Sequence, residues 1–405
     1  MSRPPTEEER ERIRCLVQQG YTPSLARNVV LARSREYLPL TIWIVDNSSS
    51  MNTKDGRRLL PTASQNDVRV MPCTRWEELK ETVVYHAQLA ALLNAPTKFI
   101  LLNRPVQPGS MNFSSCPQEM TIAERGTEWI DDDMEDFVDN FSHIQPQGVT
   151  PLSDHLRRIY QSLLHMENKI VLVLATDGKP TDPFGYSSPA VDREFENALR
   201  QVQSKAWVVI RLCTNDDSVL SYYQKLDDQE EFSLEVLDDY LDEAKEIYSY
   251  NSWLTYSLSL HRCREMGMSC HSTFRFMDWL DERSLSRDEI VHALTTLGLV
   301  AAEDRSSHTS HTLLDDGEWK KFCSMVAKEQ VHLASQKHEA GETRLEAFTP
   351  WNPIKKRTTP LVDVWYLERH GSKSSSFWSH TVWISCLIVL LLAFLVNLIL
   401  SSEVW

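Results

Sequence analysis

Two uninterrupted apolar stretches constrain the fold of this chain more than any other feature. Residues 40–45 (LTIWIV) and 169–175 (KIVLVLA) carry apolar and β-branched side chains at consecutive positions rather than at alternate ones. A strand with this pattern is covered on both faces, as the strands of parallel sheets are. Further strands are expected at 97–103 and 206–213, and helices at 75–93, 129–141 and 151–165. The alternation predicts an α/β protein with a doubly wound, mostly parallel sheet.

Small oxygen-bearing side chains follow the first apolar stretch at once. Asp46, Ser48 and Ser50 are two residues apart, so a tight loop at the end of the strand can turn all three side chains to one point. One carboxylate and two hydroxyls are hard oxygen ligands, which suit Mg²⁺ or Mn²⁺ better than zinc. Thr150, after a Gly/Pro-rich loop, and Asp177, after the second stretch, add a hydroxyl and a carboxylate. For the first loop alone, the alternative is a polar turn whose serines bond to local backbone.

The ordered set D-x-S-x-S, G-x-T-P-L and a buried strand ending in T-D-G resembles the metal-ion-dependent adhesion site of von Willebrand factor A-type domains. The resemblance covers about residues 38–226. Its matching residues are Asp46, Ser48, Ser50, Thr150 and Asp177. It implies that the hydroxyls bind a cation directly or through water and that the aspartates neutralise it. It also implies an open coordination position that accepts a carboxylate from a partner protein.

The chain departs from this family between residues 51 and 74. Here an insert, with turn signals at Asp55-Gly56, Pro61 and Pro72, separates the D-x-S-x-S loop from the first helix of the domain. Because the insert starts beside the predicted metal site, we expect it to lie on or near the binding face. We therefore expect it to influence which partner binds.

The rest of the chain divides into segments of different character. We expect a helical segment at 1–37, the A-type domain at 38–226, a helical region at 227–346, a polar and basic juxtamembrane linker at 347–380 and a transmembrane helix at 381–400. The first segment loosely resembles a ubiquitin-associated domain. The alternative for that segment is a helical hairpin packed on the sheet.

The region after the A-type domain gives weaker signals. Residues 232–264 are expected to form acidic helices, whose carboxylates include Asp238, Asp239, Asp242 and Glu243. A solvated helix face is expected there rather than a metal site, because no His or second carboxylate set accompanies them. Residues 274–299 resemble a degenerate EF-hand. Leu280 stands at a ligand position and Arg283 replaces the turn glycine, so we expect a helix-loop-helix without calcium.

Residues 381–400 form a near-continuous apolar run without charged residues, of the length that spans a bilayer. A buried core helix is the alternative. Arg369, His370 and Lys373 precede the run, and none of the five residues after it is Lys or Arg. This asymmetry predicts a single-pass, C-terminally anchored protein whose bulk is cytosolic. The lack of basic residues after the span favours the endoplasmic reticulum over the mitochondrial outer membrane.

Charge and cysteine content narrow the function. A net charge of −15 argues against a nucleic-acid binder, and eight cysteines without a C-x-x-C pair favour free thiols in a reducing compartment. The leading hypothesis is a Mg²⁺-dependent protein-binding module, not an enzyme, whose partner presents Asp or Glu. One alternative is a Mg²⁺-dependent phosphoryl-transfer or hydrolytic enzyme with Asp46 as nucleophile, although Ser48 stands where an acid/base carboxylate is often found. The other alternative is a scaffold with an unused site.

Overall fold

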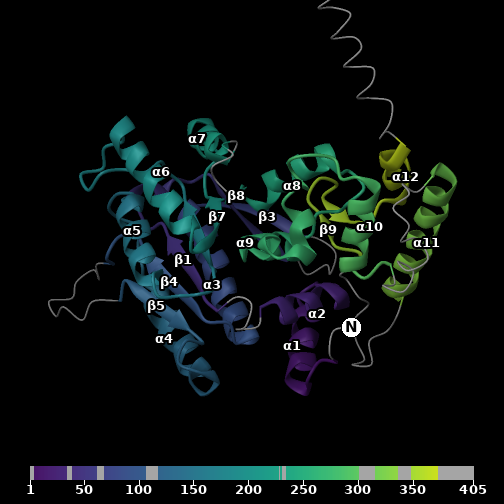
Figure 1. Ribbon diagram of the computed structural model, residues 1–405, viewed down its shortest axis with the longest axis horizontal. Coiled ribbons are helices and arrows are strands. Elements are labelled where there is room, and N and C mark those ends of the chain that lie inside the picture. The colour runs from purple at the N-terminus through teal and green to yellow at the C-terminus, as the bar shows by residue number, and fades with distance from the viewer. Residues whose placement is uncertain are drawn as a thin grey trace, which may run out of the picture.

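The computed structural model describes residues 4–33, 39–61, 68–105, 117–227, 229, 234–300, 315–335 and 348–372. Its centre is a sheet in the order β5-β4-β1-β6-β7-β8, in which β4 and β5 pair antiparallel and the other neighbours pair parallel (Figure 1). The strands are β1 (Thr41–Val45), β4 (Thr97–Leu101), β5 (Glu119–Ile122), β6 (Ile170–Thr176), β7 (Ala206–Leu212) and β8 (Leu234–Leu237). The prediction of an α/β protein with a mostly parallel sheet is confirmed.

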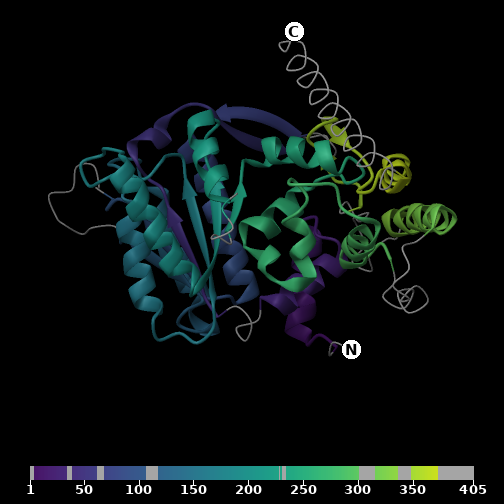
Figure 2. The ribbon, with the colours of Figure 1, turned by 45° about the horizontal axis from the view of Figure 1, so that its top comes forward.

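Helices cover both faces of this sheet, because its strands are apolar on both sides (Figure 2). Trp43 and Val45 of β1 belong to the core under α3 and α4, whereas Ile42 and Ile44 belong to the core under α5, α6 and α7. The helices are α3 (Arg75–Leu93), α4 (Ile130–Ser142), α5 (Leu152–Leu163), α6 (Pro189–Gln203) and α7 (Asp217–Asp227). The consecutive apolar residues of β1 therefore supply both cores.

The predicted insert folds as an antiparallel hairpin of β2 (Gly56–Pro61) and β3 (Val68–Cys73). In Figure 2 the hairpin extends from the sheet towards the C-terminal helices. Arg57 of β2 forms ion pairs with Asp239 and Asp242 at the start of α8. The hairpin therefore links the sheet to the helices that follow it, and this role accounts for part of its length.

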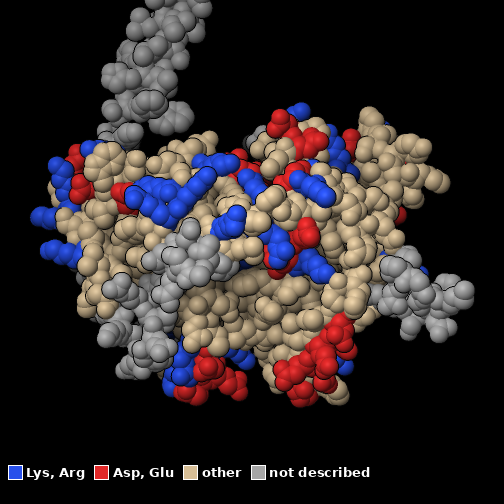
Figure 3. All heavy atoms as spheres, turned by 180° about the vertical axis from the view of Figure 1, so that it is seen from behind, with Lys and Arg blue, Asp and Glu red and all other residues tan. Residues whose placement is uncertain are grey.

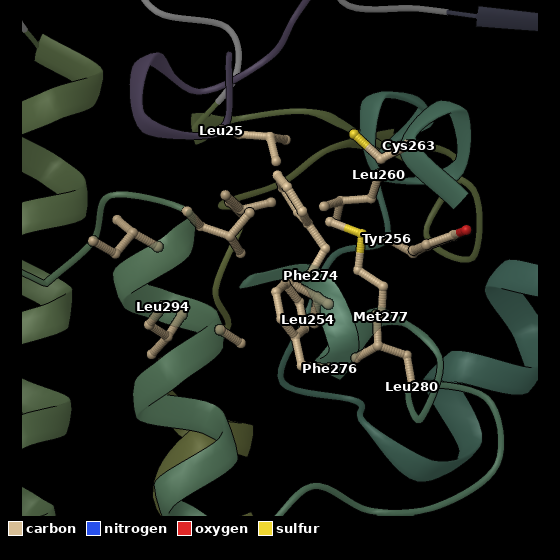
Figure 4. Packing of buried hydrophobic residues seen from close by; sticks show 14 of the residues in the cluster. Leu25, Leu254, Tyr256, Leu260, Cys263, Phe274, Phe276, Met277, Leu280 and Leu294 are labelled. Atoms are coloured by element: carbon tan, nitrogen blue, oxygen red, sulfur yellow. The ribbon is translucent and has the colours of Figure 1, made fainter. Parts of the chain in front are cut away.

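The remaining helices share one hydrophobic core. They are α1 (Glu7–Gln18), α2 (Pro23–Ala32), α8 (Tyr240–Tyr250), α9 (Leu258–Glu265), α10 (Arg287–Thr296), α11 (Asp316–Ser335) and α12 (Val364–Ser372), with the short strands β9 (Trp351–Asn352) and β10 (Arg357–Thr358). Figure 4 shows Leu25 of α2 among Leu260, Phe274 and Leu294 of the C-terminal half. The N-terminal helices are thus packed against the C-terminal half of the described chain.

The N-terminal hairpin of α1 and α2 packs chiefly against other helices and not, as the alternative expectation had it, on the sheet. The amide of Asn28 donates to the carbonyl of Thr296 in α10 at 3.3 Å. The hydroxyls of Tyr21 and Tyr85, the latter on α3, are 3.1 Å apart. Its apolar residues belong to the same hydrophobic core as those of the C-terminal helices.

The expectation of acidic helices from residue 232 is wrong at its start. Residues Leu234–Leu237 form the sixth strand, parallel to β7, so the sheet continues past residue 226. The acidic Glu235 concealed this strand in the sequence. In the fold Glu235 is buried, and its carboxylate is compensated by the Arg264 guanidinium at 2.7 Å.

Arg264 is the centre of a buried charge cluster that joins β8 to the helices. Its guanidinium also pairs with Glu243 of α8 and, at 3.0 Å, with Asp281. The predicted solvated helix face is therefore wrong for Glu243, which is only 1% exposed. Asp239 caps the N-terminus of α8, whereas Glu243, four residues later, is buried. The carboxylates of this helix therefore do not form one solvated face.

The EF-hand-like segment begins with a 3₁₀ helix, η4 (Ser272–Met277), and ends with α10. Leu280 is buried, and the carboxylate of Glu289 binds Arg283 and the Ser286 N–H in the capping box of α10. Glu289 is thus engaged as a helix cap.

Within the described ranges, no helix combines the length and the apolar character needed to cross a bilayer. The predicted span at 381–400 lies outside these ranges. The six cysteines that the structure describes are free thiols.

We predict that Arg264→Ala destabilises the protein by about 3–5 kcal/mol, because it leaves buried carboxylates without their counter-ion. Arg157→Ala is the control: Arg157 pairs with exposed carboxylates on the surface of α5 and α6, so the loss should stay below about 1 kcal/mol. Urea unfolding measures both. Equal, small losses would show that the Arg264 cluster does not hold β8 to the helices.

Candidate metal centre

The candidate site lies where the strand order of the sheet reverses. When the six strands are numbered by their order along the chain, they lie across the sheet in the order 3-2-1-4-5-6. The chain therefore adds β4 and β5 on one side of β1 and then returns to the other side with β6. The carboxyl ends of these two neighbours carry Asp46 and Asp177. Open α/β sheets bind ligands at such a switch point.

Asp46 extends the ladder between β1 and β6 and is completely buried. Its N–H donates to the carbonyl of Ala175 at 2.9 Å. One carboxylate oxygen accepts the N–H of Ser48 at 2.8 Å, and the other accepts the hydroxyl of Thr176 at 2.7 Å. The side chain is therefore fixed by its own loop and by the neighbouring strand.

The hydroxyls of the first loop connect the two carboxylates. Ser50 lies in a short 3₁₀ helix, η1 (Ser49–Asn52), which brings its Oγ to 3.0 Å from the Oγ of Ser48. The Ser50 hydroxyl also donates to Oδ1 of Asp177 at 2.8 Å. The two-residue spacing of the motif thus gathers its side chains on one side of the loop.

Thr150 reaches the same place from the second loop. The Ser49 N–H donates to the carbonyl of Gly148 at 3.2 Å, which fixes the second loop on the first. The Thr150 hydroxyl lies 3.7 Å from the point that a Cβ on Gly178 would occupy, next to Asp177. The structure therefore brings all five predicted residues together, and the missing side chain at Gly178 leaves space beside the Thr150 hydroxyl.

The two carboxylates are costly to ionise together. Burial raises the pKa of Asp46 to about 6, and the charge of Asp177 adds to the increase, although hydrogen bonds from Thr176 and Ser48 oppose it. Burial also raises the pKa of Asp177, against the lowering effect of hydrogen bonds from Arg75 and Ser50. A divalent cation between them would favour the ionised forms of both groups.

Sequence reasoning missed Arg75, the first residue of α3. Its guanidinium binds Oδ2 of Asp177 at 2.9 Å and holds Asp55 of the insert with two nitrogens, at 2.7 and 2.6 Å. Nothing local could have revealed this contact, because Arg75 and Asp177 are 102 positions apart. Asn47 was missed too: its amide exchanges hydrogen bonds with the backbone of Asn103 at 2.9 and 2.8 Å, which ties the loop to the end of β4.

The residues present fit a hard divalent cation. Two carboxylates and three hydroxyls converge without a sulfur or imidazole ligand, which is a donor set for Mg²⁺ or Mn²⁺. Among the described residues, one acidic group of a different kind, Glu243, Glu246 and Asp281, has ligand atoms within 4.8 Å of one another. Arg264 already neutralises two of its members, so we favour the switch-point site.

No protein-family model matches this chain, and comparison with curated proteins gives no match. The resemblance to A-type domains therefore stays a prediction from the sequence motif.

We predict that Asp46→Asn removes Mg²⁺ uptake in calorimetry and, in EDTA at neutral pH, makes the protein more stable than the wild type. The metal-free wild type loses stability as pH rises from the unfolded pKa of 3.8 through the folded pKa of about 6, because folding then requires a buried charge. This loss is about 3 kcal/mol at most.

Adding saturating Mg²⁺ should reverse the order, because binding to the folded state stabilises only the wild type. Thermal melts in EDTA and in Mg²⁺ measure both effects. If the wild type is folded at the start of the melt and has the same melting temperature in EDTA and in Mg²⁺, the metal site is refuted.

Proposed function

We propose that this chain is a metal-dependent protein-binding module, related to von Willebrand factor A-type domains and tethered to a membrane by residues 381–400. The observation that carries the proposal is the meeting of Asp46 and Asp177 with three hydroxyls at the switch point of the sheet. Such a site combines two carboxylates with neutral oxygen donors, as a hard divalent cation requires.

The five residues of the site would have two roles in this function. Ser48, Ser50 and Thr150 offer neutral oxygens, and Asp46 and Asp177 offer the charges. A Mg²⁺ held there would supply a positive centre with a free position for a carboxylate of the partner. The chain itself keeps the five groups in place through the hydrogen bonds of both loops.

The geometry supports binding more than catalysis. Both oxygens of Asp46 already accept hydrogen bonds, and the side chain is buried, so it is poorly placed to attack a phosphoryl group. Ser48 follows in the position where an acid/base carboxylate would be needed. We therefore propose that the chain is not an enzyme.

One contact favours the alternative of a scaffold with an unused site. Arg75 already pairs with Asp177 and so neutralises part of the charge that would attract a cation. However, Arg75 shares its guanidinium with Asp55, and it contacts a single oxygen of Asp177. The other oxygen of Asp177 faces Ser50 and the proposed site.

Part of the chain's negative charge is concentrated on one helix. Exposed carboxylates gather on α4, at the lower edge of the molecule in Figure 3. They are Asp131, Asp132, Glu135, Asp136 and Asp139. An acidic segment of a partner would therefore be repelled from this helix.

We predict that partner capture by the full-length chain requires Mg²⁺, fails in EDTA, and falls about tenfold or more in Thr150→Ala, which removes one ligand hydroxyl. The Thr150 backbone keeps its bonds to Thr181, so the loop should stay folded. Ser204→Ala, at the end of α6, is the control with unchanged capture. Quantitative affinity purification with paired melts measures this. Equal capture of the same proteins in EDTA would support the scaffold instead.

A further inference from the structure

Two aromatic side chains are largely exposed to solvent beside the candidate site. Phe184 is 82% exposed and Tyr186 is 70% exposed, more than any other large hydrophobic residue in the described part of the chain. They lie in the segment 182–186 (DPFGY), which follows the metal loop directly. We call this segment the aromatic turn. Clustered exposed aromatics in a soluble protein mark an interaction surface.

The backbone of the aromatic turn is held by hydrogen bonds within the turn. Asp182, Pro183 and Gly185 occupy the positions that a tight turn prefers, and the Gly185 N–H donates to the Asp182 carbonyl at 3.0 Å. The Asp182 carboxylate accepts the N–H groups of Phe184 and Tyr186, each at 2.9 Å. The sequence thus fixes the backbone of both aromatics before any partner arrives.

The aromatic turn is attached to the second metal loop. Thr181 donates its N–H to the Thr150 carbonyl at 3.0 Å and accepts the Thr150 N–H on its hydroxyl at 3.1 Å. Gly185 has a φ of +88°, and a Cβ there would lie only 2.9 Å from Cγ1 of Val149. The turn therefore packs on the residue before Thr150, so its position is fixed relative to a proposed ligand.

We propose that Phe184 and Tyr186 bind an apolar side chain of the partner next to the carboxylate that the metal site accepts. This inference rests on the proposed function and extends it to the partner's chemistry. The recognised element is a protein segment in which an Asp or Glu lies within a few residues of an apolar side chain. Aromatic side chains have few rotatable bonds, so they provide a large contact area at a low cost in conformational entropy.

Charge favours a protein segment over a lipid surface as the occupant. The aromatic turn contains no Lys or Arg, and the chain carries a net charge of −15. Surfaces that dock on anionic membranes usually combine aromatics with basic residues. An acidic–apolar segment needs only the cation and the two rings.

The test uses the full-length chain in detergent and a displayed library of short peptides with a fixed aspartate, selected in Mg²⁺ and eluted with EDTA. Selected peptides should carry an apolar residue close to the aspartate. The variant Phe184→Ser/Tyr186→Ser should bind these peptides about tenfold or more weakly, with unchanged Mg²⁺ affinity by calorimetry. Val331→Ser, which replaces a residue 69% exposed on α11, is the matched control and should bind normally.

The outcomes separate this inference from the proposed function. If EDTA-eluted peptides require the aspartate but no apolar neighbour, or if the double variant binds them equally well, the aromatic turn has no such role and the metal function stands. If Mg²⁺ binds but EDTA elutes no peptide, the proposed function fails and this inference fails with it.

A cross-linking amino acid identifies the occupant directly. With p-benzoyl-phenylalanine at position 184, in the chain reconstituted in lipid nanodiscs, we expect Mg²⁺-dependent cross-links to the selected peptide. Cross-links mainly to lipid, or to a second copy of the chain, would overturn the proposal.

Discussion

Two carboxylates that the fold buries beside each other form the constraint on which the functional site depends. Asp46 and Asp177 end neighbouring strands, so the parallel pairing of β1 and β6 forces their charges together. The surrounding hydroxyls and Arg75 compensate this cost only in part, since the pKa of each carboxyl stays raised. A site built this way gains from a cation, because the cation removes the repulsion that the fold imposes.

The rest of the chain supports that face without covering the aromatic turn. The insert hairpin follows the loop of residues 46–50 and binds the helices through Arg57, and Asp55 of the insert holds Arg75. The sheet is extended by β8, which Arg264 attaches to α8. Both connections are ion pairs, and both attach the sheet to the helices that follow it.

Local patterns in the sequence predicted the sheet and the loop of Asp46, Ser48 and Ser50, because both depend on short spacings. Thr150 and Asp177 come from distant segments and were grouped with that loop through the expected sheet edge and the A-type resemblance. The apolar stretch 40–45 and the D-x-S-x-S loop are contiguous, so strand, loop and ligands could be derived together. Contacts between distant residues outside these motifs could not be derived. Arg75 meets Asp177, and Arg264 neutralises Glu235, only after the chain has folded, so the first contact was missed and the strand containing Glu235 was taken for helix.

The central claim is that the switch-point site binds a hard divalent cation, and crystals grown with Mn²⁺ test it most directly. Anomalous diffraction at the manganese edge should give a peak about 2.1 Å from ligand oxygens of the site formed by Ser48, Ser50 and Thr150. A peak at Glu243, Glu246 and Asp281 instead, or no peak at either place in a folded protein, would contradict the account.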